Sequence, residues 1–285
     1  KVSYIFGKLP LVELSLQMTT SSRTASSKFA NYAREIELHW KYKERQRKQF
    51  LFNSPQLQLR SHLVGWLKNI SEKLKVSYRT IHLAVYILDT FMDNHSISKD
   101  RLGFVALVCL MLAAKFEELD SKIPKISELN KYDGYRYSSK DFISVEVMVL
   151  KFLDFGLTQP TIAHFAEYYT MVSILPHDLK SVKFSFHHLA DIACNMVAEL
   201  LDICLKEVKF LQHPPSKVAA ACILVTRKRL RLSPAWTPVL AEVTGYKEDS
   251  LNFCTNLLMY KIQQENVRRK QWVNSPDHGY ISDAP

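Results

Sequence analysis

The run from Leu102 to Ala114 contains no charged residue, and it constrains the fold more than any other part of the chain. A helix that is apolar over this length has to be buried on nearly all sides. Lys115 follows at once, and Phe116, Glu117 and Glu118 complete the ending. Because an unpaired buried ammonium group is costly, we expect Lys115 either to pair with an acid or to be presented to a partner.

The composition favours an all-α protein of one large or two ordinary domains. Of the 285 residues, 47% are apolar and 23% are charged, a normal globular balance that argues against general disorder. Glycine is scarce, with seven residues, and most of the eleven prolines lie between apolar runs. Short connections between helices are therefore expected.

Apolar residues at helical spacing predict a series of helices along the chain. The first is expected to begin at Asn31. The others are expected near 59–70, 81–92, 102–118, 126–129, 142–152, 162–169, 186–208, 216–227, 239–243 and 250–262.

Two of these predicted helices resemble each other. The runs 106–115 and 218–227 are both rich in small apolar residues, both end in a cation and both are third in their set. We therefore predict two consecutive five-helix bundles, each around a small-residue central helix and preceded by an N-terminal helix. The expected boundaries are a poorly ordered extension (1–30), an N-terminal helix and linker (31–54), the two bundles (55–157 and 158–263) and a C-terminal tail (264–285).

The chain is basic, with a formal net charge of +10 and a pI of about 9.3. Its basic clusters lack the interleaved aromatic residues of many nucleic-acid surfaces, so nucleic-acid binding is not expected. We expect Lys41–Lys48 to be a solvated helix face that runs into a loop. The cluster Arg227–Arg231 is expected at a helix end, where cations complement the helix dipole, and it could also serve nuclear import.

The cysteines indicate an intracellular protein, nuclear or cytoplasmic. All five lie among apolar neighbours without CxxC spacing, so we expect reduced core residues and neither a disulfide framework nor a zinc site. The longest uncharged run is well short of the ~20 residues that a membrane span needs, so no membrane association is expected. The start of the chain is interrupted by Lys8, Pro10 and Glu13, which argues against a signal peptide.

No constellation for catalysis is found in the sequence. Glycine-rich phosphate loops, GxSxG and HExxH are absent, so we expect neither an enzyme nor a bound cofactor. His187, His188 and Asp191 could lie on one helix face as metal ligands, but paired histidines at the start of an element are usually surface residues. We therefore expect no metal site.

Several motifs, in order and at similar spacing, resemble the cyclin family over about residues 32–263. In the first bundle they are 59–66 (LRSHLVGW), 82–89 (HLAVYILD), 114–118 (AKFEE) and 146–155 (EVMVLKFLDF). In the second they are 159–169 (QPTIAHFAEYY), 215–221 (PSKVAAA) and 244–251 (TGYKEDSL). Three runs, 54–59, 164–169 and 232–236, resemble one subgroup within that family.

The resemblance implies a regulatory subunit that forms a heterodimer with a cyclin-dependent protein kinase. Lys115 and Glu146 match the lysine and glutamate with which cyclins hold the kinase near its mobile αC helix. Five further residues match positions that contact the kinase: Phe116, Glu117, Phe155, Leu157 and Ile36. Plain core packing of the two phenylalanines, and an internal pair without a partner for Lys115 and Glu146, are the alternatives.

The resemblance also implies a structural ion pair and a degenerate substrate-docking patch. Arg60 and Asp89 match the internal pair that ties the first two helices of the cyclin box. The matching patch for an Arg-x-Leu peptide consists of Leu59, His62, Leu63, Trp66 and Leu102. His62 replaces an aliphatic residue there, Gly65 and Asn69 replace acids, and Gly103 replaces a glutamine, so weak or absent docking is expected.

An alternative function uses the same fold. Some general transcription factors related to cyclins bind nucleic acid and the transcription machinery with it. Lys115 paired with Glu146, together with the acids Glu117 and Glu118, favours the kinase surface because exposed acids would repel phosphate.

Overall fold

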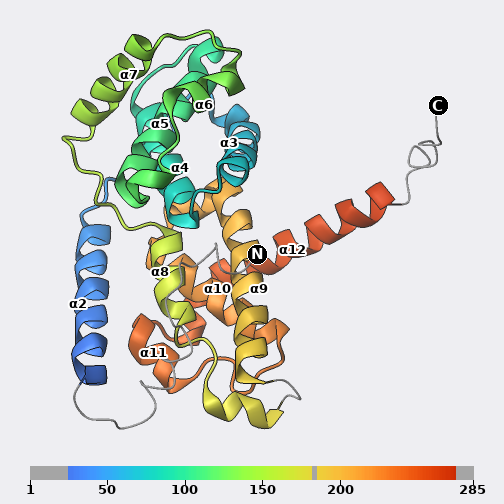
Figure 1. Cartoon of the computed structure of the whole chain (residues 1–285). Coiled ribbons are helices and arrows are strands. Elements are labelled where there is room, and N and C mark those ends of the chain that lie inside the picture. Colours follow the sequence, from blue (N-terminus) through green and yellow to red (C-terminus); the bar gives the residue numbers. More distant parts are fainter. Residues whose placement is uncertain (1–24, 182–184, 274–285) are drawn as a thin grey trace, which may run out of the picture.

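The computed structural model describes residues 25–181 and 185–273, and these form helices joined by short connections (Figure 1). An N-terminal helix, α2 (Ala25–Arg45), precedes two bundles. The first bundle contains α3 (Arg60–Leu74), α4 (Tyr78–Asn94), α5 (Leu102–Glu117), α6 (Ile126–Asn130) and α7 (Ser139–Phe152). The second contains α8 (Ile162–Thr170), α9 (Phe186–Lys206), α10 (Pro215–Arg229), α11 (Pro238–Thr244) and α12 (Asn252–Val273). No strand occurs in the described ranges, so the predicted all-α pair of five-helix bundles is confirmed.

Each bundle is built around its small-residue helix, as predicted. On α5 every residue from Phe104 to Ala114 is buried, and α5 packs most extensively against α4. On α10 every residue from Val218 to Arg227 is buried, and its main neighbour is α8. Small side chains let the surrounding helices approach these two central helices closely.

Local capping signals explain several helix ends. Ser77 accepts a hydrogen bond from the Thr80 amide at the start of α4, and Ser138 forms a capping box with Asp141 at the start of α7. Gly245 ends α11 with a left-handed backbone (φ +72°), a conformation that costs glycine little.

The two bundles contact each other directly. Helix α3 packs against α9, and α4 packs against α8. Helix α2 runs beside the second bundle, near α8 and α11, and α12 projects away from the body of the molecule (Figure 1). Helix α2 is bound to α11 by Lys41, whose ammonium donates to the Thr244 carbonyl oxygen at 2.7 Å.

Two expectations about the ends of elements need correction. Helix α2 begins at Ala25, inside the predicted extension 1–30, and residues 1–24 lie outside the described residues. Helix α12 continues to Val273, past the predicted start of the tail at 264, because glutamine, glutamate, lysine and arginine there are good helix formers. Residues 274–285, with the Ser-Pro dipeptide at 275–276, lie outside the described residues.

The segment 41–48 is only in part the solvated face that its charge pattern suggested, because Tyr42, Arg45 and Lys48 are exposed but other charged residues are not. Lys41 pairs with Glu37 at 2.8 Å, and both Glu44 carboxylate oxygens accept hydrogen bonds from Ser216 on α10. The Arg47 guanidinium lies over the Tyr86 ring, 3.9 Å from its centroid. These charges join α2 to both bundles.

Candidate functional site

The end of α5 and the middle of α7 are joined by an ion pair at the surface. Lys115 Nζ lies 2.7 Å from Glu146 Oε1, and 45% of the lysine side chain is exposed. The charge-free core of α5 ends at Ala114, so Lys115 is the first side chain of this helix that can reach water. The lysine therefore pairs with an acid and is also presented to solvent, which combines the two possibilities that its position allowed.

Exposed apolar side chains lie close to this pair in the sequence. Phe116 is 45% exposed and Phe155 is 68% exposed, so neither is the core residue that the alternative assumed. Ile143 and Val147 are also exposed, and helical spacing places them on the side of α7 that carries Glu146. We call Lys115, Phe116, Ile143, Glu146, Val147 and Phe155 the Lys115 face.

Sequence reasoning missed Ile143 and Val147, although a signal for them existed. The core stripe of α7 uses Phe142 and Val149, which are fully buried. Ile143 and Val147 lie outside that stripe, and apolar residues off the core side of an amphipathic helix indicate a second contact surface.

Two further residues with predicted kinase contacts lie at the margins of this region. Leu157 is half-buried and packs against the core of the first bundle. Ile36 is half-buried on α2, where Leu38 and Tyr42 are more exposed.

The Glu117 and Glu118 carboxylates face inward, in contrast to their neighbours. His164 Nδ1 accepts from the Thr161 amide, so its Nε2–H donates to Glu117 Oε1 at 3.0 Å. Glu118 Oε1 accepts from the Ser77 amide and the Thr80 hydroxyl, both at 2.6 Å. The expectation that these two acids form part of an exposed acidic surface is therefore wrong, because internal donors bind both carboxylates.

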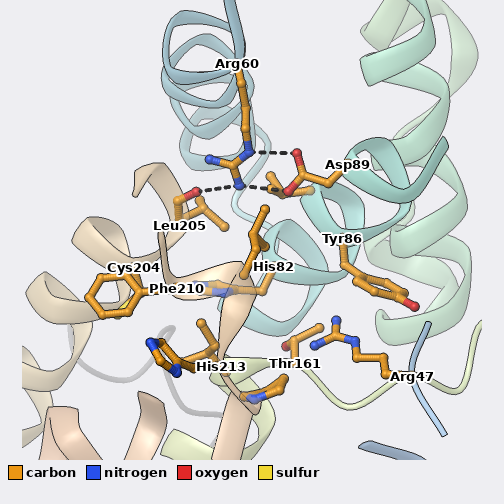
Figure 2. A pocket seen from close by; sticks show the side chains of 14 residues that line it. Arg47, Arg60, His82, Tyr86, Asp89, Thr161, Cys204, Leu205, Phe210 and His213 are labelled. Carbon is orange, nitrogen blue, oxygen red and sulfur yellow. Dashed lines mark hydrogen bonds and ion pairs between the residues drawn. The ribbon is translucent and has the colours of Figure 1, made fainter. Parts of the chain in front are cut away.

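Arg60 and Asp89 form the predicted ion pair, and its bonding extends beyond the first bundle. Arg60 Nε and a terminal nitrogen donate to the two Asp89 oxygens, each at 2.7 Å, and both side chains are buried (Figure 2). The same guanidinium donates to the carbonyl oxygens of Leu205 and Lys206 on α9. The pair thus ties α3 to α4 and also ties the first bundle to the second.

A second buried arginine was not predicted. Arg227 is 0% exposed, and its guanidinium binds both oxygens of Asp178 at 2.7 and 2.9 Å. Three carbonyl oxygens, from Ser173, Pro234 and Ala235, accept its remaining hydrogen bonds. Arg227 lies in the last turn of α10, as expected, and Asp178 and these carbonyl groups enclose its guanidinium.

The predicted docking patch is only partly open. His62 is exposed and Leu59 is 39% exposed, whereas Leu63 and Trp66 are half-buried against the core. Leu102 is buried, so its side chain belongs to the core. A β-carbon at Gly103 would lie 3.6 Å from the Trp66 ring, which fits van der Waals contact.

The described residues show no candidate for a metal site, a disulfide or a membrane-spanning helix. They contain no group of three or more histidine, cysteine or acidic side chains that could hold a metal ion. All five cysteines are free and buried, as predicted. Among the helices of the described ranges, none has the length and apolar character required to cross a membrane.

Comparison with known proteins identifies the family. The cyclin N-terminal domain model matches residues 29–158, and the cyclin C-terminal domain model matches residues 160–282. The chain therefore belongs to the cyclin family, with both of its domains in tandem.

Curated relatives confirm the predicted subgroup resemblance. Cyclin-J from Xenopus laevis is 34% identical over 79% of this chain, and cyclin-J from Homo sapiens is 32% identical over 84%. The matches cover 61% and 64% of those two proteins, so the chain spans about three fifths of the length of these relatives. A G2/mitotic-specific cyclin-A from Hydra viridissima is 29% identical over 88% of this chain and 57% of its own length.

Solved structures support the same fold. A viral cyclin from herpesvirus saimiri superposes with a TM-score of 0.62, at 18% identity, over 79% of this chain and 93% of its own. A chain of the yeast RNA Pol II CTD kinase CTDK-1 complex superposes with a TM-score of 0.52, at 17% identity, over 70% of this chain and 63% of its own.

Proposed function

We propose that this chain is the regulatory subunit of a cyclin-dependent protein kinase and performs no catalysis itself. The observation that carries the proposal is the Lys115 face, where a lysine that is 45% exposed pairs with Glu146 and the neighbouring positions on α5 and α7 carry exposed aromatic and aliphatic side chains. Large exposed apolar residues around a charged centre are typical of protein–protein contacts. The names of the relatives, which include a G2/mitotic-specific cyclin, support a role in cell-cycle control.

The proposed mechanism is a population shift in the kinase. An active protein kinase pairs its strand lysine with the glutamate of its αC helix. A partner that binds only the inward position of that helix favours the active state by its difference in affinity for the two states. We propose that Phe116, Ile143 and Val147 supply apolar contact with that helix, and that Lys115 and Glu146 fix its orientation. An interface of this kind buries roughly 2,000 Å² or more in total.

Charge reversal tests the assignment. Lys115→Glu and Glu146→Lys are each expected to lower activation of the kinase by about 30-fold or more, the effect of about 2 kcal/mol at an interface. The measurement is phosphorylation of a Ser-Pro peptide by purified cyclin-dependent kinases, tested one by one with this chain. Wild-type chain that binds and activates none of these kinases would contradict the proposed function.

The chain offers a matched control for the charge reversal. Lys228 Nζ lies 2.7 Å from Glu248 Oε1, and both side chains are 41% exposed on the second bundle. Lys228→Glu makes the same charge change in the same kind of pair, and it is expected to leave activation unchanged.

A double variant separates binding from fold maintenance. Lys115→Glu with Glu146→Lys keeps the internal ion pair but exchanges the two charges that a partner would meet. We expect it to stay folded, by circular dichroism, and to stay inactive. Full activation by this variant would assign the pair to the stability of the first bundle instead.

A further inference from the structure

A small cavity lies where the two bundles and the segment after α2 meet. Its volume is about 40 Å³. The lining includes Arg60 on α3, four residues of α4, and residues from α8, α9 and α10. Figure 2 shows Arg60 and Asp89 at the top of the view, His82 and Tyr86 below them, and His213, Thr161 and Arg47 along the bottom from left to right.

Three buried nitrogen atoms in the lining have no hydrogen-bond partner in the described residues. They are Arg47 Nε, His82 Nε2 and His213 Nε2. The His82 residue is only 5% exposed, so bulk water does not satisfy its ring nitrogen. The remaining polar groups are occupied, because Arg60 binds Asp89 and two carbonyl oxygens, and the Thr161 hydroxyl contacts His164 Nδ1 at 2.8 Å.

The electrostatic environment of the cavity is positive. Arg47 carries a permanent charge, and in the described residues no carboxylate oxygen lies within ion-pair distance of it. Asp89, the acid in the lining, is already neutralised by Arg60. Burial, together with the nearby His164 and Lys68, lowers the pKa of His82 to about 3. Burial and Lys217 likewise lower the pKa of His213.

We propose that this cavity is a binding site for one small inorganic anion of about the size of chloride. Arg47 supplies the charge and a buried N–H, and the two histidines supply N–H donors in their Nε2–H tautomers. The cavity volume of about 40 Å³ is a few times the ~10–15 Å³ that one water molecule needs by the same measure, so the cavity suits a small ion better than a nucleotide or a sugar. Water could fill the space and bind the donors, but only an anion would add a negative charge beside Arg47, because the two acids that act on it electrostatically, Glu44 and Asp89, already bind Ser216 and Arg60.

An anion at this position would link the segment after α2 to both bundles. Arg47 follows α2, His82 belongs to α4 of the first bundle, and His213 directly precedes α10 of the second. A single ion in contact with all three would therefore hold the N-terminal segment and both bundles together. Arg47 and His213 are only half-buried, so they are the sides from which the ion can enter.

The direct test uses bromide as a replacement for chloride. In crystals of the full chain grown with sodium bromide, we expect an anomalous difference peak in the cavity, within contact distance of Arg47 and the two histidines. Ordinary solvent density without an anomalous peak would mean a hydrated cavity only, and would overturn the proposal.

A solution test measures thermal unfolding of the full chain. Chloride replaces gluconate, an anion too large for the cavity, at constant ionic strength. We expect the melting temperature to rise and saturate with chloride for wild type. The half-saturating chloride concentration is expected to rise about tenfold or more in Arg47→Gln, which loses one charge-assisted contact.

Two further variants keep the solution test decisive. Arg45→Gln removes the same charge from an exposed position at the end of α2, and it is expected to respond to chloride as wild type does. His213→Asn changes a half-buried side chain, and its half-saturating concentration is also expected to rise. If wild type shows no saturable response, or if Arg47→Gln and His213→Asn both respond as wild type does, the site is not an anion site.

Discussion

The central helices of the two bundles end in the same way in sequence and in opposite ways in structure. On α5 the final cation is Lys115, which is half-exposed and paired with one acid, Glu146. On α10 the corresponding cation is Arg227, which is fully buried and bound by Asp178 and three carbonyl oxygens. The comparison shows that one repeat encloses its cation for stability, whereas the other leaves its cation at the surface.

The chemistry of the two side chains suits these two roles. A guanidinium group offers five donors in a planar fork, so it can bind a carboxylate and several carbonyl oxygens at once. An ammonium group has a flexible stem and a compact, strongly hydrated charge, which suits an exposed position. Arg227 therefore satisfies its environment completely, and Lys115 retains exposed surface for a partner.

The largest expected effect is at the enclosed cation. Arg227→Met leaves the buried Asp178 carboxylate without the guanidinium that neutralises it, so we expect a loss of about 3–5 kcal/mol in the free energy of unfolding. Urea denaturation followed by circular dichroism measures it. Lys228→Met, one residue further along the helix, is the control and should change the free energy little. A loss below 1 kcal/mol for Arg227→Met would remove the contrast between the repeats.

A second prediction concerns the docking patch on the first bundle and asks whether two substitutions can restore binding of an Arg-x-Leu peptide. Gly65→Asp with Asn69→Glu restores the acids expected in the docking patch, and nothing lies within 4 Å of a β-carbon at Gly65. Each charge-assisted hydrogen bond to the peptide arginine contributes about 1.5–3 kcal/mol. We expect wild type to bind an Arg-x-Leu peptide weakly, and the double variant at least about tenfold more tightly, by fluorescence titration. Tight binding by wild type would show that the patch is not degenerate.

Acid should weaken the junction between the bundles through His82. Because burial lowers the pKa of His82 to about 3, the unfolded chain binds more protons than the folded chain between about pH 6.5 and 3. Stability therefore rises with pH in this window, and about 2 kcal/mol should be lost from pH 7 to pH 5. Urea denaturation in gluconate buffer measures this loss.

His82→Gln is the control for the acid effect, because glutamine does not titrate. We expect the loss between pH 7 and pH 5 to shrink by about 2 kcal/mol in this variant. An unchanged pH dependence would place the acid sensitivity elsewhere in the chain.

The smallest expected effect is at the exposed cation. Lys115→Met removes an ion pair whose lysine is nearly half exposed, so we expect a change of only about 0.2–1 kcal/mol in the free energy of unfolding. The measurement is the same urea titration as for Arg227→Met. A loss as large as that of Arg227→Met would mean that both cations serve stability.

The fold could be predicted from the sequence because its signals are local. The charge-free run of α5, the small residues of α10 and the capping serines each act within one or two helical turns. Lys115 and Glu146 could be identified through a family motif, and the structure then shows their side chains in contact.

The environment of Arg227 could not be predicted, because its partner is remote. Asp178 is 49 positions away in the chain, in the short helical segment Pro176–Ser181, and no local pattern connects the two. A buried cation and an exposed one look alike at the end of an apolar helix. The same limit applies to the cavity, whose unpartnered nitrogens come from three separate parts of the chain.

The inward bonding of Glu117 and Glu118 has a consequence for how fast and how tightly the Lys115 face can bind. Because these two carboxylates are tied to α8 and α4, the backbone that carries Lys115 and Phe116 is fixed before any partner arrives. Association then requires little ordering of this segment, so less of the contact energy is spent on lost entropy. The preformed ending of α5 thus favours rigid docking over folding upon encounter.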